Sequence, residues 1–530
     1  MPHDAIVIGS GFGGTLAAHA LVEAGARVLM IERGDWVRRG PDNWAGHAVA
    51  PLSPHYRTDT PYQVLAGAER GVVGSIQCVG GPSVFYGGVS LRLRARDFAP
   101  DSESAGAAAG AAWPFAYEEL EPFYDRAERL IGVAGQAGDD PTEPPRSRPY
   151  PHSPGALAPA SRLVWQAARD LGLHPFRLPL AFNHTRAEGR SPCVGCPTCD
   201  GFACAVEAKN DLATAVLPGL LKRGLELRTG TVAGRLVSER GRVRAAICID
   251  RATGRLERHS APLFVLAAGA LASPHLVLAS GLESLNPAGH LVGRFLMRHW
   301  NAVVMGFFPG RPGPERQFHK QVGIHDFYFG HGSVRRPHGR LGGIQQLATP
   351  PAALVRSHLP APVGALAATT LGHVTGLLVI AEDEPQESNG LAIDPRGRDR
   401  FGLPQLLVTH RYTTRDVAAG NVLVGKAKAI LHRAGACLTY VQPIRTFSHA
   451  LGTLRMGTHP RLSVVDPHGR FRGLENLYVA DASVFPTSAS VNPSLTIAAG
   501  ALRIGEALAH QGVGAVPSWE RIAAPAEPAA

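Results

Sequence analysis

The residues best suited to chemistry lie near the C-terminus, between Ser448 and His510. This stretch holds His449 and, further on, Asn492, followed by Pro493 and an amphipathic pattern. Asn is a favoured N-cap, and proline is favoured at the first helical position because its missing N–H is not needed there. We therefore expect a helix that starts at Pro493. The partial positive charge of its first N–H groups suits an anion, or a carbonyl that becomes anionic during a reaction.

A second group able to do chemistry is a run of four cysteines, Cys193, Cys196, Cys199 and Cys204. Short turns with Gly and Pro at this spacing let thiolates converge on one ion, as in an iron–sulfur cluster or a zinc knuckle. The run departs from the bacterial ferredoxin pattern, in which three residues precede the last Cys and a Pro follows it. Three interpretations therefore stay open: a metal site, one or two disulfides, or free thiols packed in a loop.

The N-terminus carries a turn that could hold a cofactor. Residues 5–8 form an apolar run typical of a buried parallel strand, and Gly9, Gly11 and Gly14 follow with the spacing Gly-x-Gly-x-x-Gly. A helical pattern, a second strand and Glu32 come next. In this order the glycines permit a tight turn, a close approach to a pyrophosphate and close helix–strand packing, and Glu32 would accept hydrogen bonds from a ribose. The pattern predicts a dinucleotide-binding βαβ unit without separating NAD from FAD.

Composition narrows the class of protein. With 530 residues, 45% of them hydrophobic, the chain is long enough for two or three compact units with a large core. Its formal charge of +10 comes from basic residues spread along the chain without a basic run, so we expect no nucleic-acid partner. No apolar run reaches the roughly 18 residues of a membrane span. No signal peptide precedes the first strand, so we expect a cytoplasmic protein, with export alongside a partner subunit left open.

Further segments extend the α/β pattern along the chain. Residues 80–88 form a second glycine-rich loop, and residues 263–269 form an apolar strand that leads into a glycine turn and a helical pattern up to Gly281. This second βα unit can return the chain to the first sheet. Residues 300–445 alternate strand-like runs with Pro and Gly loops, which favours a mainly antiparallel sheet with flanking helices, suited to covering a substrate.

Together these segments resemble the glucose–methanol–choline (GMC) family of FAD-dependent oxidoreductases. The resemblance rests on the order of the motifs, which are the N-terminal glycines, Gly80-Gly81-x-Ser83, Trp113-Pro114, the Gly269 to Gly281 segment, Val292-Gly293-Arg294 leading to His299, and the His449 and Asn492 regions. It implies an α/β fold, with a Rossmann-like FAD-binding domain of the GMC type and an α+β substrate-binding domain built on a largely antiparallel sheet. The FAD-binding domain is expected at 1–110, 215–300 and 455–515. The substrate-binding domain is expected at 111–214 and 301–454, including the Cys-rich excursion 193–204, with a tail at 516–530.

The resemblance also implies which residues contact FAD. They lie in the glycine turns, at strand ends and at the start of the last helix: Gly9, Gly11, Phe12, Gly13, Gly14, Glu32, Arg33, Gly80, Gly81, Ser83, Gly87, Val232, Ala268, Gly269, Asp481, Ala482, Asn492, Pro493 and Ser494. Several family members carry a His in the loop after Gly81 that bonds covalently to the flavin. Phe85 stands at that place, so we expect FAD to be bound non-covalently.

The implied reaction is the oxidation of a CH–OH group, in which hydride moves to flavin N5 while the hydroxyl proton leaves. By motif match His449 is the base, because an imidazole with a reference pKa of about 6.5 suits this proton transfer near neutral pH. Asn492 would orient the substrate oxygen. The expected substrate is a sugar, a sterol or another hydroxylated small molecule, and the expected electron acceptor is O₂, a quinone or a protein partner. The alternatives are a non-redox FAD-containing lyase of the same fold and a photodecarboxylase-like enzyme.

Overall fold

The computed structural model describes residues 3–65, 71–99, 112–185, 189–313, 320–332 and 340–510. The expected tail at 516–530 lies outside the described residues.

A parallel sheet forms the centre of one half of the molecule, with its strands in the order β18-β10-β1-β2-β6. The strands are β1 (Ala5–Ile8), β2 (Val28–Ile31), β6 (Glu226–Arg228), β10 (Leu263–Leu266) and β18 (Leu477–Val479). The middle strands are apolar throughout and fully buried, as expected for a sheet covered on both faces. Because β2 and β10 flank β1 on opposite sides, the strand order reverses at β1, which is where open α/β sheets bind their ligands.

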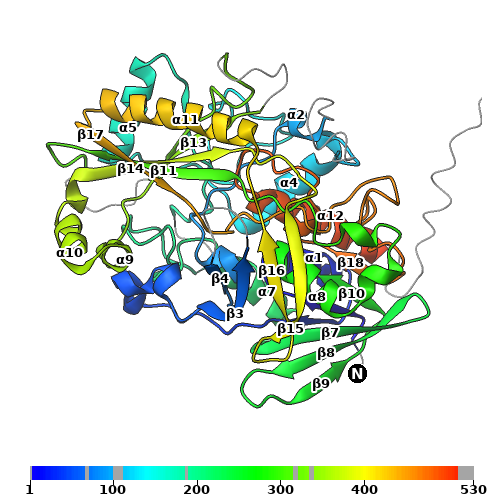
Figure 1. The fold of residues 1–530 in the computed structure, drawn as a ribbon. Coiled ribbons are helices and arrows are strands. Elements are labelled where there is room, and N and C mark those ends of the chain that lie inside the picture. The colour runs from blue at the N-terminus through cyan, green and yellow to red at the C-terminus, as the bar shows by residue number, and fades with distance from the viewer. Residues whose placement is uncertain are drawn as a thin grey trace, which may run out of the picture.

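Three helices pack on this sheet (Figure 1). They are α1 (Phe12–Glu23), α8 (Gly269–Ala279) and α12 (Ser494–His510). The two helices α1 and α12 approach each other so closely that a Cβ at Gly505 would lie 2.8 Å from the carbonyl oxygen of Ala17. The last described helix therefore lies beside the first.

A second, antiparallel sheet lies in the other half, with its strands in the order β17-β11-β14-β13-β12-β5. The strands are β5 (Pro175–Arg177), β11 (Trp300–Phe307), β12 (Val322–Ile324), β13 (Gly342–Leu347), β14 (Val374–Ala381) and β17 (Leu438–Pro443). Helices α5 (Pro159–Asp170) and α11 (Thr414–Arg433) lie over one face of it (Figure 1). The predicted α/β class with a largely antiparallel second sheet is confirmed.

Two smaller sheets and several short helices accompany these two sheets. One sheet contains β15 (Gly390–Arg398), β16 (Pro404–Thr409), β3 (Tyr56–Val64) and β4 (Gly71–Ile76), and a meander contains β7 (Thr231–Glu239), β8 (Arg242–Asp250) and β9 (Leu256–His259). The other α-helices of the described residues are α2 (Ala95–Phe98), α4 (Tyr117–Ile131), α6 (Leu212–Ala215), α7 (Leu217–Lys222), α9 (Ala352–His358) and α10 (Ala361–Thr369).

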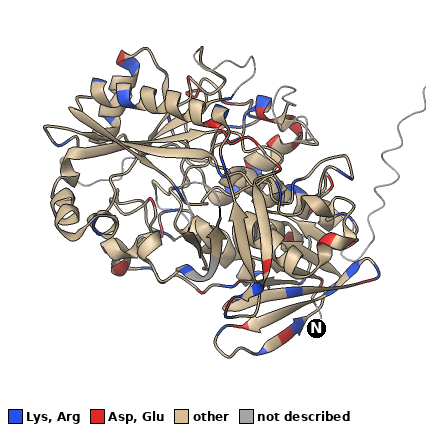
Figure 2. Ribbon diagram, viewed as in Figure 1, with Lys and Arg blue, Asp and Glu red and all other residues tan. Residues whose placement is uncertain are grey.

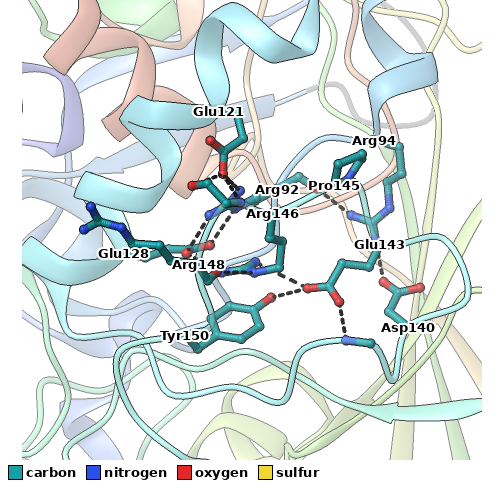
Figure 3. Close-up of polar contacts among 12 residues, drawn as sticks. Arg92, Arg94, Glu121, Glu128, Asp140, Glu143, Pro145, Arg146, Arg148 and Tyr150 are labelled. Atoms are coloured by element: carbon teal, nitrogen blue, oxygen red, sulfur yellow. Dashed lines mark hydrogen bonds and ion pairs between the residues drawn. The ribbon is translucent and has the colours of Figure 1, made fainter.

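Buried ion pairs fix the segment that follows α4 (Figure 3). Arg92 donates to both carboxylate oxygens of Glu128 at 2.8 and 2.9 Å, and Arg146 pairs with the same carboxylate. Tyr150 donates to Glu143, and the Arg146 guanidinium lies 3.7 Å from the centre of the Tyr150 ring. Buried charges are tolerated only when they are paired in this way, so these contacts hold the Pro- and Arg-rich segment in one conformation ahead of α5.

Charged residues of both signs are interspersed over the elements (Figure 2). Among the described residues no helix is both long and apolar enough to cross a membrane.

Candidate active site

Several turns meet at the carboxyl end of the parallel sheet. A Cβ at Gly13 would lie 1.9 Å from the carbonyl oxygen of Ala480, which follows β18. A Cβ at Gly9 would lie 2.4 Å from the carbonyl oxygen of Ala267, which follows β10, and one at Gly14 would lie 1.8 Å from the Gly9 oxygen. Glycine is needed at these places because any side chain would separate α1 from the strand ends.

The space in front of α1 is open, in contrast to this close packing. A Cβ at Gly11 or at Gly269 would meet no atom of the described residues within 4 Å. A Cβ at Gly81, in the second glycine loop, would lie 3.2 Å from the Cα of Gly11, so the two loops border the same space. The first N–H groups of a helix have no partner within it, and here they belong to Phe12 and Gly13. An open cradle beside a helix N-terminus fits the pyrophosphate of a dinucleotide.

Glu32 ties the first glycine turn to the second. Its buried carboxylate accepts from Ser10 N at 3.0 Å, from Ser10 Oγ at 2.6 Å and from Gly34 N at 2.8 Å. Ser10 Oγ in turn accepts from Gly80 N at 2.9 Å. Burial raises the pKa of Glu32. Each carboxylate oxygen offers more than one acceptor site, so Glu32 can still receive a ribose hydroxyl.

Val232 and Arg33, which were also expected to contact FAD, have different surroundings. Val232 is buried in β7, and its neighbour Thr231 donates from N to the Glu32 carbonyl at 3.0 Å. The Arg33 side chain contacts the β15–β16 connection, at 3.9 Å from Asp399 and 5.8 Å from the ring of Phe401.

Asp481 holds two turns together. Its Oδ2 accepts from Gly269 N at 2.9 Å and from Ser273 Oγ at 2.5 Å, and its Oδ1 accepts from Ser483 N at 2.8 Å and from Ser483 Oγ at 2.5 Å. Four donors therefore surround this carboxylate, whose pKa is raised by burial. Its side chain fixes the turn at Ala268 and Gly269 against the short 3₁₀ helix η8 (Ala482–Val484).

The second glycine loop is held by side chains that point back at it. Ser83 Oγ donates to the Gly80 carbonyl at 2.6 Å and accepts from Leu212 N at 3.1 Å. Lys209 is fully buried and donates to the carbonyl of Tyr86 at 2.8 Å. At Gly87 a Cβ would lie 2.8 Å from both the Asp200 carboxylate and the Lys320 ammonium, so two charged side chains rest on this loop.

His449 contacts a second histidine, His299. The Nε2 atom of His299 lies 3.0 Å from the Ser488 carbonyl oxygen, which can only accept, so Nε2 of the neutral ring carries the proton. The Nδ1 atom of His299 is then an acceptor, and it lies 2.9 Å from Nδ1 of His449. His449 Nδ1 must therefore donate. This assigns the free lone pair of His449 to Nε2.

Both imidazoles are held neutral. Burial, the neighbouring His299 and the Lys320 ammonium keep the pKa of His449 well below its usual value of 6.5. Burial also lowers the pKa of His299. His299 is fully enclosed, whereas His449 is only partly buried and is therefore accessible to a small molecule. A neutral, accessible imidazole with its lone pair at Nε2 is a general base.

The backbone around this pair is strained. His299 has φ 63° and Ala489 has φ 50°, in the left-handed region that residues other than glycine rarely adopt. Tyr412 donates to the His299 carbonyl at 2.7 Å and helps to hold that conformation. Such strain gathers at functional sites. Sequence reasoning used His299 only as the end of a family motif and missed its contact with His449.

Asn492 is oriented by Gln345 of β13. Its Oδ1 accepts from Gln345 Nε2 at 2.6 Å, so the donor side of the Asn492 amide stays available to a substrate oxygen. The expected N-cap role is wrong, because α12 begins at Ser494 and it is the Pro493 carbonyl that accepts the helical bond from Ile497 N, at 2.9 Å. Helix start and capping group are both one residue later than predicted, since the Asn492 side chain turns towards the antiparallel sheet.

The four clustered cysteines are free thiols, with Cys199 and Cys204 buried and Cys193 and Cys196 partly buried. Over the described ranges, which include all four, no three or more His, Cys, Asp and Glu side chains are placed to hold a metal ion. Of the three interpretations left open by the sequence, the iron–sulfur or zinc site receives no support from this arrangement. The Lys209 ammonium donates to the Cys199 carbonyl at 3.0 Å and so fixes this segment beside the second glycine loop.

Comparison with known proteins decides the family. Models described as GMC oxidoreductase match residues 4–301 and 385–501. The chain belongs to the GMC oxidoreductase family. It is 30% identical to 6'''-hydroxyparomomycin C oxidase of Streptomyces lividus and 31% identical to paromamine 6'-oxidase of Streptomyces fradiae, and each match covers 96% of this chain and 91% of the relative. It is 28% identical to 2-methyl-1,2-propanediol dehydrogenase of Mycolicibacterium austroafricanum, over 96% of this chain and 95% of the relative.

Solved structures support the same fold for this GMC oxidoreductase. The crystal structure of pyridoxine 4-oxidase from "Mesorbium loti" superposes with a TM-score of 0.66, covering 96% of this chain and 99% of that one at 20% identity. The family implies FAD as cofactor, and the open cradle at Gly11, Gly81 and Gly269 fits it. Members of the family act as oxidases and dehydrogenases on CH–OH groups.

Proposed function

We propose that this GMC oxidoreductase oxidises a CH–OH group of a small hydroxylated molecule, with His449 Nε2 as the base that removes the hydroxyl proton. The observation that supports this proposal most directly is the chain of hydrogen bonds from the Ser488 carbonyl through His299 to His449. It leaves one lone pair, at Nε2, on the half-buried ring of His449. When bound, FAD would supply the acceptor for the hydride that leaves the carbon bearing this hydroxyl.

The residues around His449 each have a separate task in this proposal. His299 holds His449 in the tautomer that can accept a proton, and it receives the Nδ1–H bond before and after that transfer. Asn492 donates from its amide to the substrate oxygen, because Gln345 occupies its acceptor side. Positioning of this kind lowers the barrier by removing the need to orient the reactants.

The FAD would be held without a covalent bond, since Phe85 stands where some members of the family have the linking His. Residues of the glycine turns would hold its pyrophosphate, and Glu32 its ribose. Acid precipitation of the holoenzyme should release all the flavin into the supernatant. Flavin that stays with the precipitate would contradict non-covalent binding.

The substrate class follows from chemistry common to the relatives. Two of them are named as oxidases, of 6'''-hydroxyparomomycin C and of paromamine, and one as a dehydrogenase of 2-methyl-1,2-propanediol. For this chain the proposal extends to alcohols of sugars, sterols and other hydroxylated molecules. The rate at which the reduced enzyme reoxidises in air separates an oxidase from a dehydrogenase that uses a quinone or protein partner.

An anaerobic stopped-flow experiment tests the function. The wild-type holoenzyme is mixed with a panel of sugars, glycosides, sterols and aliphatic alcohols, and bleaching of the FAD absorbance is followed. His449→Ala should retain FAD and be reduced at least about 100-fold more slowly, the scale of general-base catalysis. His459→Ala, which removes an exposed histidine, is the matched control and should behave as wild type. Reduction of the His449 variant at the wild-type rate would refute the assignment.

The cysteine segment bears on the electron acceptor, because an iron–sulfur cluster would carry electrons out of the protein. We propose that the four cysteines work as free thiols, which is supported by the lack of three converging ligands among the described residues. Elemental analysis after anaerobic purification should then find neither iron nor zinc in proportion to protein. Iron in proportion to FAD would overturn this proposal and favour a dehydrogenase.

A further inference from the structure

Two short helices, α9 and α10, form a hairpin at one end of the antiparallel half (Figure 1). Thr349 Oγ1 donates to the Val374 carbonyl at 2.9 Å, which ties the segment before α9 to the first residue of β14. The two helices lie close together, because a Cβ at Gly364 of α10 would be 3.1 Å from the Cα of Arg356 in α9. The hairpin therefore has a defined shape and is closed at its base.

The hairpin turns its larger apolar side chains outward. Gly364 and Ala368 are the buried residues of α10, whereas Val363 and Leu366 are 52% and 70% exposed. No residue of α9 is buried. A helix that only covers the protein buries its large apolar side chains, as α11 does with Leu423. Helix α10 has the opposite arrangement, so its apolar face is directed at the solvent.

A second apolar segment lies beside the hairpin. It consists of the 3₁₀ helices η1 (Pro41–Trp44), η2 (Gly46–Ala48) and η3 (Ala50–Leu52). A Cβ at Gly46 would lie 2.9 Å from the Cβ of Ala353, so η2 packs against α9. Trp44 and Leu52, which end η1 and η3, are both exposed.

The exposed apolar residues of these neighbouring elements are called the hairpin surface here. They are Trp44, Leu52, Leu359, Val363 and Leu366. A single exposed leucine is ordinary, but exposed large apolar side chains gathered on adjoining elements mark a binding surface.

Cations border the hairpin surface. Arg356, in the last turn of α9, is exposed, and so is Arg311, whose Nε would lie 3.5 Å from a Cβ at Gly372, shortly after α10. Residues 349–381 contain no Asp or Glu, and Figure 2 accordingly shows no acidic residue on α9 or α10. The 3₁₀ segment adds one acid, Asp42. Exposed Trp and Leu beside Arg are the composition that enters the interface of an anionic bilayer.

The same charges disfavour a second copy of this chain as the occupant. In a twofold dimer each surface meets itself, so Arg356 and Arg311 would face the cations of the other copy. Like charges placed opposite each other weaken an interface. An anionic lipid surface brings the complementary charge, and the formal charge of +10 on the whole chain adds to the attraction.

We propose that the hairpin surface docks this enzyme on an anionic lipid bilayer, with Val363, Leu366 and Trp44 in the bilayer interface and Arg356 at the lipid phosphates. The contact is peripheral, because side chains and not a whole helix enter the lipid. It adds a partner that the proposed alcohol oxidation does not require, so each proposal can fail without the other.

Vesicle flotation tests the docking. Holoenzyme is mixed with vesicles of phosphatidylcholine that contain about 30% phosphatidylglycerol, or with vesicles of phosphatidylcholine alone, and the protein that floats with the lipid is quantified. The wild type should bind the anionic vesicles at least about tenfold more tightly than the neutral ones, and high salt should weaken this binding. Equal binding to both kinds of vesicle, or to neither, would overturn the proposal.

Variants show whether the hairpin surface makes the contact. The double variant Val363→Ser/Leu366→Ser should bind the anionic vesicles about tenfold more weakly or worse, because less apolar area leaves water. Arg356→Gln should bind them about fivefold more weakly, the scale of one cation at an anionic surface. Leu256→Ser, at a leucine 68% exposed on β9, and Arg148→Gln, at an exposed arginine, are the matched controls and should bind as wild type. Site variants that bind like their controls would overturn the proposal.

Tryptophan quenching gives a second readout that does not need the double variant to fold. Anionic vesicles that contain brominated phosphatidylcholine quench a tryptophan in the bilayer interface. The fluorescence of the wild type should therefore be quenched by a larger fraction than that of Trp44→Phe. Equal fractional quenching of the two proteins would place Trp44 outside the bilayer and overturn the docking as proposed.

A contact between copies of the chain would be seen without lipid. In sedimentation velocity the wild-type holoenzyme and Val363→Ser/Leu366→Ser should have the same oligomeric state. A wild-type oligomer that dissociates in the double variant would assign the hairpin surface to self-association and overturn the lipid proposal. FAD content and melting temperature show whether each variant has folded. None of these measurements uses turnover, so their outcome is independent of whether an alcohol reduces the FAD.

Discussion

The contact between His299 and His449 allows a quantitative prediction. In His299→Phe the ring volume is kept, but Nδ1 no longer accepts from His449 Nδ1–H, a bond of 2.9 Å in the structure. The lost bond is worth about 1 kcal/mol, and leaving a buried donor unpaired costs about 1–3 kcal/mol. His449 is then free to carry its proton on Nε2, where it cannot accept one. At about 1.4 kcal/mol per tenfold change in rate, we expect flavin reduction to slow by about 10- to 100-fold.

The assay is anaerobic stopped-flow reduction at saturating substrate, using the alcohol that reduces the wild type fastest. The reduction rate should fall while the substrate dissociation constant stays near the wild-type value, because His299 is not expected to touch substrate. His299→Gln should recover part of the rate, since its amide can donate to the Ser488 carbonyl and accept from His449. A His299→Phe enzyme with full FAD content and the wild-type reduction rate would refute the tautomer assignment.

Three further outcomes follow from the site. Burial and nearby charges hold the pKa of His449 well below 6.5, so the base is unprotonated at neutral pH. The rate of flavin reduction should therefore be constant down to pH 6.5 and fall only below it. A fall in rate centred at or above pH 6.5 would contradict this. Gly11→Ala should keep the melting temperature of the apoprotein but weaken FAD binding about tenfold or more, because its Cβ enters the open cradle. Gly13→Ala should instead destabilise the apoprotein itself, because its Cβ forces α1 off the sheet. Equal behaviour of the two variants in calorimetry and FAD titration would refute the cradle. Gln345→Leu should lower the reduction rate by about fivefold to tenfold through loss of one hydrogen bond, by letting the Asn492 amide turn over, and an unchanged rate would remove the amide from the mechanism.

Local patterns were enough to predict much of the fold. The apolar runs at β1, β2 and β10 are buried parallel strands because both faces of that sheet are covered, and such strands are apolar along their whole length. The spacing of the N-terminal glycines predicted the turn, since Gly9 and Gly14 each lie against a backbone carbonyl, whereas Gly11 borders the open space in front of α1. The alternating runs after residue 300 likewise predicted an antiparallel sheet.

Local spacing did not predict the contacts of side chains whose partners lie far away in the sequence. The four cysteines are close in sequence, yet whether their thiols converge depends on how the loop folds. Lys209 holds this loop by donating to the carbonyls of Cys199 and of Tyr86 in the second glycine loop. Asn492 has the sequence context of an N-cap, but Gln345, from a strand about 150 residues earlier, offers its oxygen a donor. Helix start then shifts by one residue to Ser494.

The sequence by itself predicted the glycine turns of the cofactor cradle and the class of fold, because these depend on residue types at short and regular spacing, and its resemblance to the family gave His449 as the candidate base. Only the tertiary structure decided the tautomer of His449, its lowered pKa and the pairing of Asp200 with Lys320. His299 and His449 are 150 residues apart, and the burial that keeps both rings neutral comes from elements of both halves of the molecule. Hydrogen-bond direction and burial are properties of the packed chain, so they have no signature in any single stretch of sequence.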